Sequence, residues 1–211
     1  MLLLIDLDNT LVDRSAAFRR WSERWAPAHG GTADDVDWLR TTDNDGYEPR
    51  ARFAERISER FGRPFDAVVA ELRAGMVDQI ELDPQVGRAL GEAVAAGWSP
   101  VVVTNGSVRQ QEAKLRHTGL DHLVAGWVIS EGAGVRKPDR RIFELAAELV
   151  HLPLTGWMIG DNAELDIGGG AAAGLATIWL PRGRTWPAGL PYRPTRTAAD
   201  CAGAIREVLR A

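Results

Sequence analysis

The sequence predicts an α/β protein whose parallel sheet is interrupted, after its first strand, by a helical insertion. Short apolar runs recur along most of the chain, and each is followed by turn residues and then by a helical pattern. That alternation is typical of a doubly wound parallel sheet. Between the first and second runs lies a long stretch with helical patterns and no convincing strand. A chain of 211 residues is long enough for one good core and a smaller appended domain.

Five apolar runs are predicted as strands of this sheet. Four of them, at residues 2–7, 100–104, 156–160 and 176–180, have the continuous apolar character of buried parallel strands, and a fifth at 127–130 is weaker. Helices are expected between them at 85–96, 108–118, 140–150 and 163–173. A last helix is expected at 198–209, after a Pro- and Arg-rich irregular connection at 181–196.

The insertion is predicted to be entirely helical. Its expected helices are 15–28, 33–40, 50–61 and 65–79, separated by Gly- and Pro-containing breaks and by a polar loop at 41–49. We therefore expect residues 1–13 and 84–211 to form the α/β core and residues 14–83 to form a separate helical domain. Such a domain could cover the carboxyl ends of the strands, where ligands bind in open α/β sheets.

The composition excludes several classes of partner. A net charge of −4 gives no reason to expect nucleic acid or an anionic membrane. No apolar run approaches the roughly 18 residues of a membrane helix, and the apolar start is too short for a signal peptide. Cys201 is the only cysteine, so no intrachain disulfide can form, and a reducing, cytoplasmic location is expected.

Two carboxylates, Asp6 and Asp8, lie at the carboxyl end of the first predicted strand. If the strand stays extended, two residues that are two positions apart point the same way, and close carboxylates repel unless a cation neutralises them. A hard cation such as Mg²⁺ suits such a pair. An ordinary turn is the alternative interpretation, because Asp-Asn-Thr also favours turns and helix caps. The pair alone leaves both interpretations open.

Polar groups also follow the later strands. Thr104-Asn105-Gly106-Ser107 starts a helix, where a hydroxyl and backbone N–H groups suit a phosphate oxygen, although an ordinary helix cap explains them equally. Asp161 follows the strand at 156–160, and Asp166 lies five residues further on. Lys137 precedes another helix, where Pro138 suits the first helical position. Among 25 Lys and Arg residues only Lys114 and Lys137 are lysines, so each lysine is more informative than usual.

The joint order of these motifs resembles the haloacid dehalogenase superfamily, specifically its phosphatase branch with a helical cap inserted after the first strand. The Asp-x-Asp-x-Thr segment from Asp6 to Thr10, the Thr-Asn-Gly at Thr104, the Lys-Pro at Lys137 and the Gly-Asp-Asn-x-x-x-Asp ending at Asp166 carry the resemblance, which spans nearly the whole chain. It implies a Rossmann-like core, an all-helical cap of the C1 type and a small phosphorylated metabolite as substrate.

The resemblance also implies the roles of individual residues. Asp6 would attack phosphorus and carry an aspartyl-phosphate, and Asp8 would protonate the leaving oxygen and then activate water. Thr104, Asn105 and Lys137 would bind the phosphate. Mg²⁺ would be bound by Asp6, Asp161 and the backbone carbonyl of Asp8, with Thr10 and Asp166 supporting the site.

Asp8 also bears on which chemistry is expected. Members of the superfamily that cleave carbon–halogen bonds lack a carboxylate at that position, and members that cleave phosphonates lack it too and use a lysine from the cap. The cap segment of this chain contains no lysine. A Mg²⁺-dependent phosphomonoester hydrolase is therefore expected. In the cap, the polar residues Asp43, Asn44, Asp45 and Arg50 are candidates for substrate specificity, with a solvated helix connection as the alternative.

Three other functions remain as alternatives. A phosphoryl transferase or mutase of the same superfamily would share the aspartyl-phosphate step. A receiver-like phosphoacceptor module would use similar residues, but its phosphorylated Asp ends a middle strand and no insertion follows its first strand. A catalytically inactive relative is opposed by the presence of every motif residue.

Overall fold

The computed structural model describes all of residues 1–211, in two compact units. One unit comprises residues 1–12 and 82–211, and the other comprises residues 13–81. The division expected from the sequence, after residues 13 and 83, differs from this by one or two residues.

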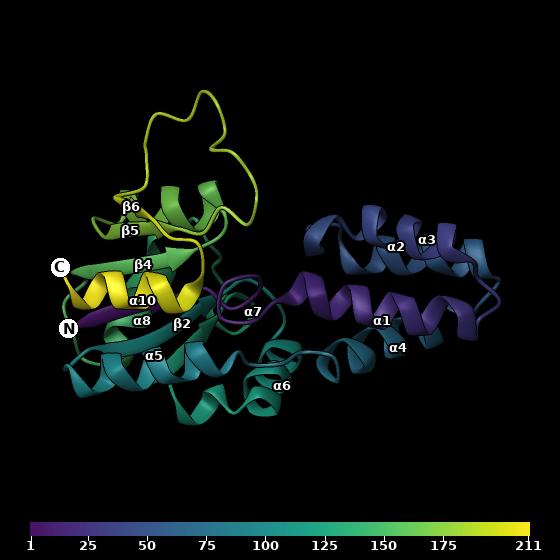
Figure 1. Cartoon of the computed structure of the whole chain (residues 1–211), viewed down its shortest axis with the longest axis horizontal. Coiled ribbons are helices and arrows are strands. Elements are labelled where there is room, and N and C mark those ends of the chain that lie inside the picture. The colour runs from purple at the N-terminus through teal and green to yellow at the C-terminus, as the bar shows by residue number, and fades with distance from the viewer. The chain divides into compact units, whose positions relative to one another are not determined.

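The first unit is built on a six-stranded, all-parallel sheet (Figure 1). Its strands are β1 (Leu2–Ile5), β2 (Ser99–Thr104), β3 (Gly126–Ile129), β4 (Gly156–Gly160), β5 (Ala176–Trp179) and β6 (Arg196–Thr197). Their spatial order is β3-β2-β1-β4-β5-β6, so β1 lies at the centre between β2 and β4. The chain reverses its direction of travel across the sheet at β1, and the carboxyl ends of strands at such a point are where α/β proteins bind ligands.

Helices cover both faces of this sheet. On one face, α8 (Arg140–Leu149) packs its apolar side on alternate residues of the central strands, in a core cluster that includes Leu2, Leu4, Val101, Val103, Ile142 and Phe143. On the other side, α5 (Pro84–Ala95) packs beside α10 (Cys201–Leu209). The first strand is buried along its whole length. Burial on both faces explains why these strands read as continuous apolar runs.

The remaining elements of this unit are short, apart from α6 (Val108–Thr118). They are η2 (Leu120–His122), α7 (Ser130–Ala133), the π-helical turn η3 (Ala163–Gly168) and α9 (Gly169–Ala172). The sequence predicts one helix over 163–173, whereas the structure divides it into η3 and α9. The helix α8 begins at Arg140, where the predicted helix also begins, and Pro138 is not its first residue. Asp139 caps it by accepting a hydrogen bond from Arg141 N. The edge strand β6 begins only at Arg196, so residues 181–195 form the irregular connection that was expected.

The second unit is entirely helical. It contains α1 (Arg14–Ala28), α2 (Ala33–Asp43), the short helix η1 (Asn44–Gly46), α3 (Arg50–Phe61) and α4 (Phe65–Val77). Aromatic side chains form much of its core: Trp21 stacks on Phe18 and on Trp25, and Phe53 is fully buried. Trp21 and Trp25 are therefore core residues. None of the helices in either unit is long and apolar enough to cross a membrane.

Candidate active site

Three polar residues meet at the carboxyl edge of the sheet because their strands are neighbours. Asp6 follows β1, Thr104 ends β2 and Asp161 follows β4. The register of β1 against β2 and β4 is continuous up to Ile5, and Asp6 N donates a hydrogen bond of 2.9 Å to Ile159 O. All three residues are buried. The parallel topology therefore brings together side chains that are about 100 and 155 positions apart in the chain.

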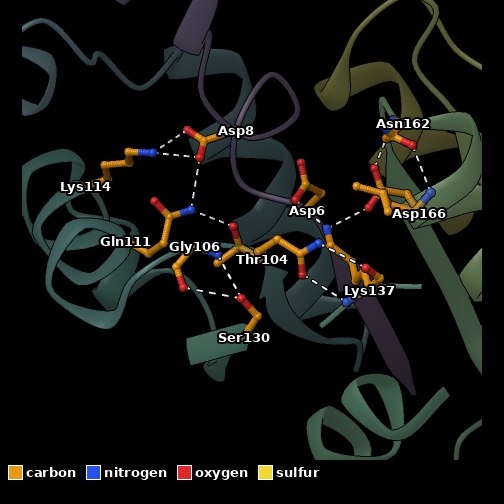
Figure 2. Close-up of polar contacts among 12 residues, drawn as sticks. Asp6, Asp8, Thr104, Gly106, Gln111, Lys114, Ser130, Lys137, Asn162 and Asp166 are labelled. Atoms are coloured by element: carbon orange, nitrogen blue, oxygen red, sulfur yellow. Dashed lines mark hydrogen bonds and ion pairs between the residues drawn. The ribbon is translucent and has the colours of Figure 1, made fainter. Parts of the chain in front are cut away.

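Lys137 connects two of the carboxylates (Figure 2). Its Nζ atom donates a hydrogen bond of 2.6 Å to Asp6 Oδ1 and another of 2.6 Å to Asp166 Oδ1. Asn105 orients the lysine, because its side chain exchanges two hydrogen bonds with the Lys137 backbone, at 2.9 and 3.1 Å. Asp166 is oriented in turn by Asn162, whose backbone N–H donates to Oδ2 at 2.9 Å. The positions of Lys137 and Asp166 are thus set by hydrogen bonds on both sides.

Three acids form the centre of the site. Asp6, Asp161 and Asp166 are all buried and each offers an oxygen within 4.8 Å of the others. Burial raises the pKa of Asp6 well above its ordinary value, and Asp166 and Asp161 raise it further, while Lys137 opposes them. Burial by itself would lower the pKa of Lys137, but Asp166 and Asp6 outweigh it and raise that pKa. The cluster therefore carries more negative charge than Lys137 alone can balance.

Arg184 is the second cation of the cluster, and the sequence did not predict it. Its Nη2 atom donates to Asp161 Oδ2 at 2.8 Å and to Asp161 O at 2.7 Å. Burial and the neighbouring Asp166 raise the pKa of Asp161 to about 6, although Arg184 and Lys137 act in the opposite direction. Arg184 lies in the connection between β5 and β6. Its only sequence signal was the richness of that connection in arginine.

Asp8 does not point the same way as Asp6, which corrects the expectation of an extended pair. The strand ends at Ile5, and the chain turns, with Asn9 in the left-handed region at φ 62°. Asp8 instead forms an ion pair with Lys114, whose Nζ lies 2.7 and 2.6 Å from its two carboxylate oxygens (Figure 2). The acids that crowd Asp6 are therefore Asp161 and Asp166.

The start of α6 is already satisfied by protein groups. The backbone N–H of Gly106 donates to Ser130 Oγ at 3.0 Å, and that of Val108 donates to Glu131 Oε2 at 2.8 Å. These two N–H groups are thus not open to a phosphate, contrary to the expectation for a helix start. The hydroxyl of Thr104 accepts a hydrogen bond of 2.6 Å from Gln111 Nε2, which leaves the hydroxyl hydrogen for another acceptor.

The residue expected to support the site, Thr10, and those expected to contact substrate from the helical unit differ in burial and in their hydrogen bonds. Thr10 is buried and its hydroxyl has no hydrogen-bond partner. In the helical unit, Asp43 is buried and accepts hydrogen bonds from both terminal nitrogens of Arg14, while Arg50 lies 3.9 Å from it. Asp45 is exposed and accepts a hydrogen bond from Ser15. Asp43 therefore makes its contacts within the helical unit, and a contact of these residues with substrate stays a prediction.

A Mg²⁺ ion fits the chemistry of this cluster. Mg²⁺ prefers carboxylate and carbonyl oxygens together with water and substrate phosphate. Asp6, Asp161 and Asp166 provide three clustered carboxylates, and Asp6 has a pKa that burial and negative neighbours have raised. A divalent cation beside these oxygens would relieve that crowding and keep Asp6 ionised. The expected ligand set of Asp6, Asp8 and Asp161 shares two of these three residues.

Buried acids and a buried lysine gathered at the carboxyl edge of a parallel sheet are features of an α/β enzyme. The chain belongs to the haloacid dehalogenase-like hydrolases, since the model of that family matches residues 1–174. Phosphoserine phosphatase of Thermus thermophilus is 31% identical over 198 residues, which cover 89% of this chain and 77% of that protein. The pyrimidine 5′-nucleotidase YjjG of Escherichia coli is 46% identical over 81 residues, which cover 37% of this chain and 36% of that protein.

Solved structures share the fold over the whole chain. The HAD-hydrolase YfnB of Bacillus subtilis, determined with magnesium bound, has a TM-score of 0.76 and 22% identity, covering 98% of this chain and 97% of that one. The L-2-haloacid dehalogenase PA0810 has a TM-score of 0.75 and 18% identity, covering 100% and 99%. The predicted family and fold are therefore confirmed, and the phosphatases among the relatives identify the chain as a phosphatase of this family.

Proposed function

We propose that this chain is a Mg²⁺-dependent phosphomonoester hydrolase that acts on a small phosphorylated metabolite through an aspartyl-phosphate at Asp6. The observation that carries the proposal is the separation of two carboxylates into two environments. Asp6 is buried beside Lys137 and two further acids, whereas Asp8 is held by Lys114 and its side chain is 24% exposed. Two carboxylates in different surroundings can take two different roles in one reaction.

In the first step, a carboxylate oxygen of Asp6 attacks phosphorus and the bond from phosphorus to the ester oxygen breaks. Asp8 must take up a proton before this step, in place of its ion pair with Lys114. It then gives that proton to the leaving oxygen, and the product alcohol departs. In the second step Asp8, now ionised, takes a proton from water as the water attacks the phosphoryl group on Asp6. Phosphate leaves and both aspartates return to their starting state. The covalent intermediate divides one difficult displacement into two easier ones.

Lys137 and Thr104 are proposed to hold the phosphoryl group between these two acids. Lys137 donates two hydrogen bonds to Asp6 and Asp166, which leaves a third N–H for a phosphoryl oxygen. Thr104 has its hydroxyl hydrogen available for the same purpose. Phosphoryl transfer is accelerated chiefly by positioning and by neutralising charge on the transferred oxygens. Asn105 would act mainly by orienting Lys137.

We propose that Mg²⁺ is bound by Asp6, Asp161 and the backbone carbonyl of Asp8, and that the neighbouring Asp166 supports this site. When bound, the ion would neutralise charge on the phosphoryl oxygens and on Asp6. Arg184 partly balances the charge of Asp161, and its hydrogen bond to Asp161 Oδ2 would have to weaken as the ion binds. Thr10 is proposed to support the turn that carries Asp8.

The substrate class is proposed from the relatives together with the cap. Relatives named for phosphoserine, pyrimidine 5′-nucleotides and glyceraldehyde 3-phosphate are all named for small phosphate esters. The exposed part of the cap loop, Asn44 and Asp45, and the partly exposed Arg50 are proposed to read the part of the substrate that leaves. Asp43 would act indirectly, through its ion pair with Arg14.

A screen of phosphorylated metabolites with the purified full chain tests this function. Phosphate should be released from at least one small ester in the presence of Mg²⁺, and a chelator should stop the release. Asp6→Asn should abolish turnover while the protein stays folded. Asp8→Asn, given an aryl phosphate with a good leaving group, should accumulate phosphorylated protein that is visible by intact mass.

Other outcomes would reassign the chemistry. Halide release from a 2-haloacid would indicate a dehalogenase, and an isomerised sugar phosphate formed without free phosphate would indicate a mutase. Turnover retained by Asp6→Asn would remove Asp6 as the nucleophile.

A further inference from the structure

Besides Lys137, the chain has one other lysine, Lys114. It lies in the core domain and is not part of the family motifs described above. Lys114 lies on α6, its side chain is 5% exposed, and its Nζ is 2.7 and 2.6 Å from the two oxygens of Asp8. A buried lysine is costly unless it is paired, so its placement beside Asp8 calls for an explanation. In a chain whose cations are otherwise almost all arginine, this one is a lysine.

Gln111 extends the contact to the phosphate-binding side of the site (Figure 2). Its Nε2 atom donates to Asp8 Oδ2 at 3.0 Å and to Thr104 Oγ1 at 2.6 Å. Gln111 and Lys114 are three residues apart on α6, so they lie on the same face of the helix. One helical face therefore contacts both the carboxylate that would protonate the leaving group and the hydroxyl that would bind phosphate.

The backbone beside Gln111 leaves room for this arrangement. A Cβ atom on Gly106 would lie 2.9 Å from Gln111 Cδ and Cγ, closer than such atoms approach. Glycine at this position thus allows the glutamine to pass over the backbone and reach Thr104. Gln111 is itself 2% exposed, which restricts its rotamers.

The orientation of the Asp8 carboxylate depends on the contacts that its side chain makes. It follows the end of β1, in a turn with left-handed Asn9, and its side chain is 24% exposed. A short carboxylate in that position could rotate away from a leaving oxygen. Contacts to both of its oxygens hold the plane of the carboxylate, and misplacement of a reacting group by about 1 Å can cost on the order of 10²-fold in rate.

We propose that Lys114 and Gln111 are positioning residues that hold the Asp8 carboxylate for proton transfer to the leaving oxygen and connect its orientation to that of Thr104. The proposal rests on the proposed function. Neither residue touches the reacting atoms: Lys114 acts on both oxygens of Asp8, and Gln111 acts on Oδ2 and on the Thr104 hydroxyl. The proton itself still passes between Asp8 and the ester oxygen.

The dependence of kcat/KM on the leaving group tests the proposal. An ester whose alcohol is a weak acid needs the proton from Asp8, whereas an activated aryl phosphate does not. For wild type the dependence on leaving-group acidity should be shallow, and for Asp8→Asn it should be steep. Lys114→Met should resemble Asp8→Asn, losing about 10²-fold on alkyl phosphates and less than about tenfold on an activated aryl phosphate. Gln111→Leu should show the same pattern to a smaller extent.

Arg116→Met is the matched control. Arg116 lies on the same helix and forms an ion pair with Glu112, but its side chain is 60% exposed. This variant should retain the wild-type dependence of kcat/KM on leaving-group acidity. Lys114→Arg, which keeps the charge, should recover part of the alkyl phosphate activity. Combining Lys114→Met with Asp8→Asn should cause no loss beyond that of Asp8→Asn.

Three results would overturn the proposal. An equal loss on all leaving groups in both Lys114→Met and Gln111→Leu would show that these residues only support the fold. If both variants fold and keep the wild-type dependence of kcat/KM on leaving-group acidity, Lys114 and Gln111 do not act on Asp8. A loss of activity in the combined Lys114→Met and Asp8→Asn variant beyond that of Asp8→Asn would show the same. If wild type releases no phosphate, or Asp6→Asn retains turnover, the proposed function fails instead, so the two failures are distinguishable.

Discussion

The ammonium group of Lys137 donates a hydrogen bond of 2.6 Å to Asp6, although the two residues are 131 positions apart in the chain. Both are buried, and Asp166 accepts a second hydrogen bond of the same length from the lysine. A buried charge without a partner is strongly unfavourable. The lysine is therefore expected to stabilise the folded core as well as to bind phosphate.

Lys137→Met should destabilise the core by about 3–5 kcal/mol in metal-free buffer near pH 8, because it leaves Asp6 and Asp166 buried without their cation. Near pH 5 the loss should be smaller. The pKa of Asp6 is already raised and rises further without the lysine, so the carboxyl group can take up a proton there. Denaturant unfolding at the two pH values measures this. Arg136→Met, at the exposed neighbouring position, should change stability by no more than about 0.5 kcal/mol.

Asp161→Asn should make the metal-free protein more stable at pH 8. The folded pKa of Asp161 is about 6, above the ordinary 3.8, so folding favours its protonated form. Stability from this group is therefore fully present below about pH 4 and is lost as pH rises through 6. The advantage of the variant should appear above pH 6 and fade below pH 4, as followed by thermal unfolding.

Mg²⁺ should make wild type more stable than Asp161→Asn, which reverses their order in metal-free buffer. Binding to the folded state stabilises wild type in proportion to the logarithm of Mg²⁺ concentration, whereas Asp161→Asn should respond weakly. Glu55→Gln, an exposed carboxylate on α3, should behave like wild type in both experiments. A variant that is no more stable than wild type at pH 8 would mean that the buried charge of Asp161 is fully compensated by Arg184.

The sequence was sufficient to predict the first five strands of the sheet, though not β6, and the polar residues at the ends of β1, β2 and β4. Strands buried on both faces must be apolar throughout, so the polar residue that ends each run is conspicuous, as with Asp6, Thr104 and Asp161. Parallel topology then places those ends at one edge without any further information. The predicted bounds of β2 and β4 differ from the observed ones by at most one residue.

Side-chain direction and long-range pairing could not be predicted in the same way. The left-handed conformation of Asn9 turns the chain after β1, so Asp8 faces Lys114, 106 residues away, instead of accompanying Asp6. Arg184 reaches Asp161 through a connection whose path depends on tertiary contacts. The rarity of lysine in the sequence drew attention to Lys114, but it did not predict that Lys114 pairs with Asp8.

Gly160→Ala should disable the site while changing only one methyl group. A Cβ atom at this position would lie 2.3 Å from Asp166 Cγ, so the carboxylate must move away from Lys137. A shift of that kind is expected to lower kcat/KM by on the order of 10²-fold. Gly91→Ala is the control. Gly91 is an exposed position of α5 where a Cβ would meet nothing within 4 Å, so this change should be neutral or slightly stabilising. Wild-type kinetics in Gly160→Ala would show that Asp166 can shift without consequence.

In the helical unit of residues 13–81, the Arg14–Asp43 ion pair should contribute to folding. Both side chains are less than 5% exposed, and Arg14 Nη2 lies 2.6 Å from Asp43 Oδ1. Arg14→Met leaves Asp43 beside Arg50, which is 3.9 Å away, and should destabilise the helical unit by about 3–5 kcal/mol. Faster proteolysis within residues 13–81 measures this. Replacing both partners, with Arg14→Met and Asp43→Leu, should recover much of the stability, because no unpaired charge is then buried.

Arg40→Met is the control variant in the same helical unit. Arg40 also pairs with an aspartate, Asp37, but the two side chains are 50% and 76% exposed and the pair spans a single helical turn. Exposed pairs of this kind contribute about 0–1 kcal/mol, so proteolysis of this variant should match wild type. Equal sensitivity of Arg14→Met and Arg40→Met would contradict a structural role for the buried pair. Asp43 would then return as a candidate for substrate recognition, to be tested by the effect of Asp43→Asn on KM across the metabolite panel.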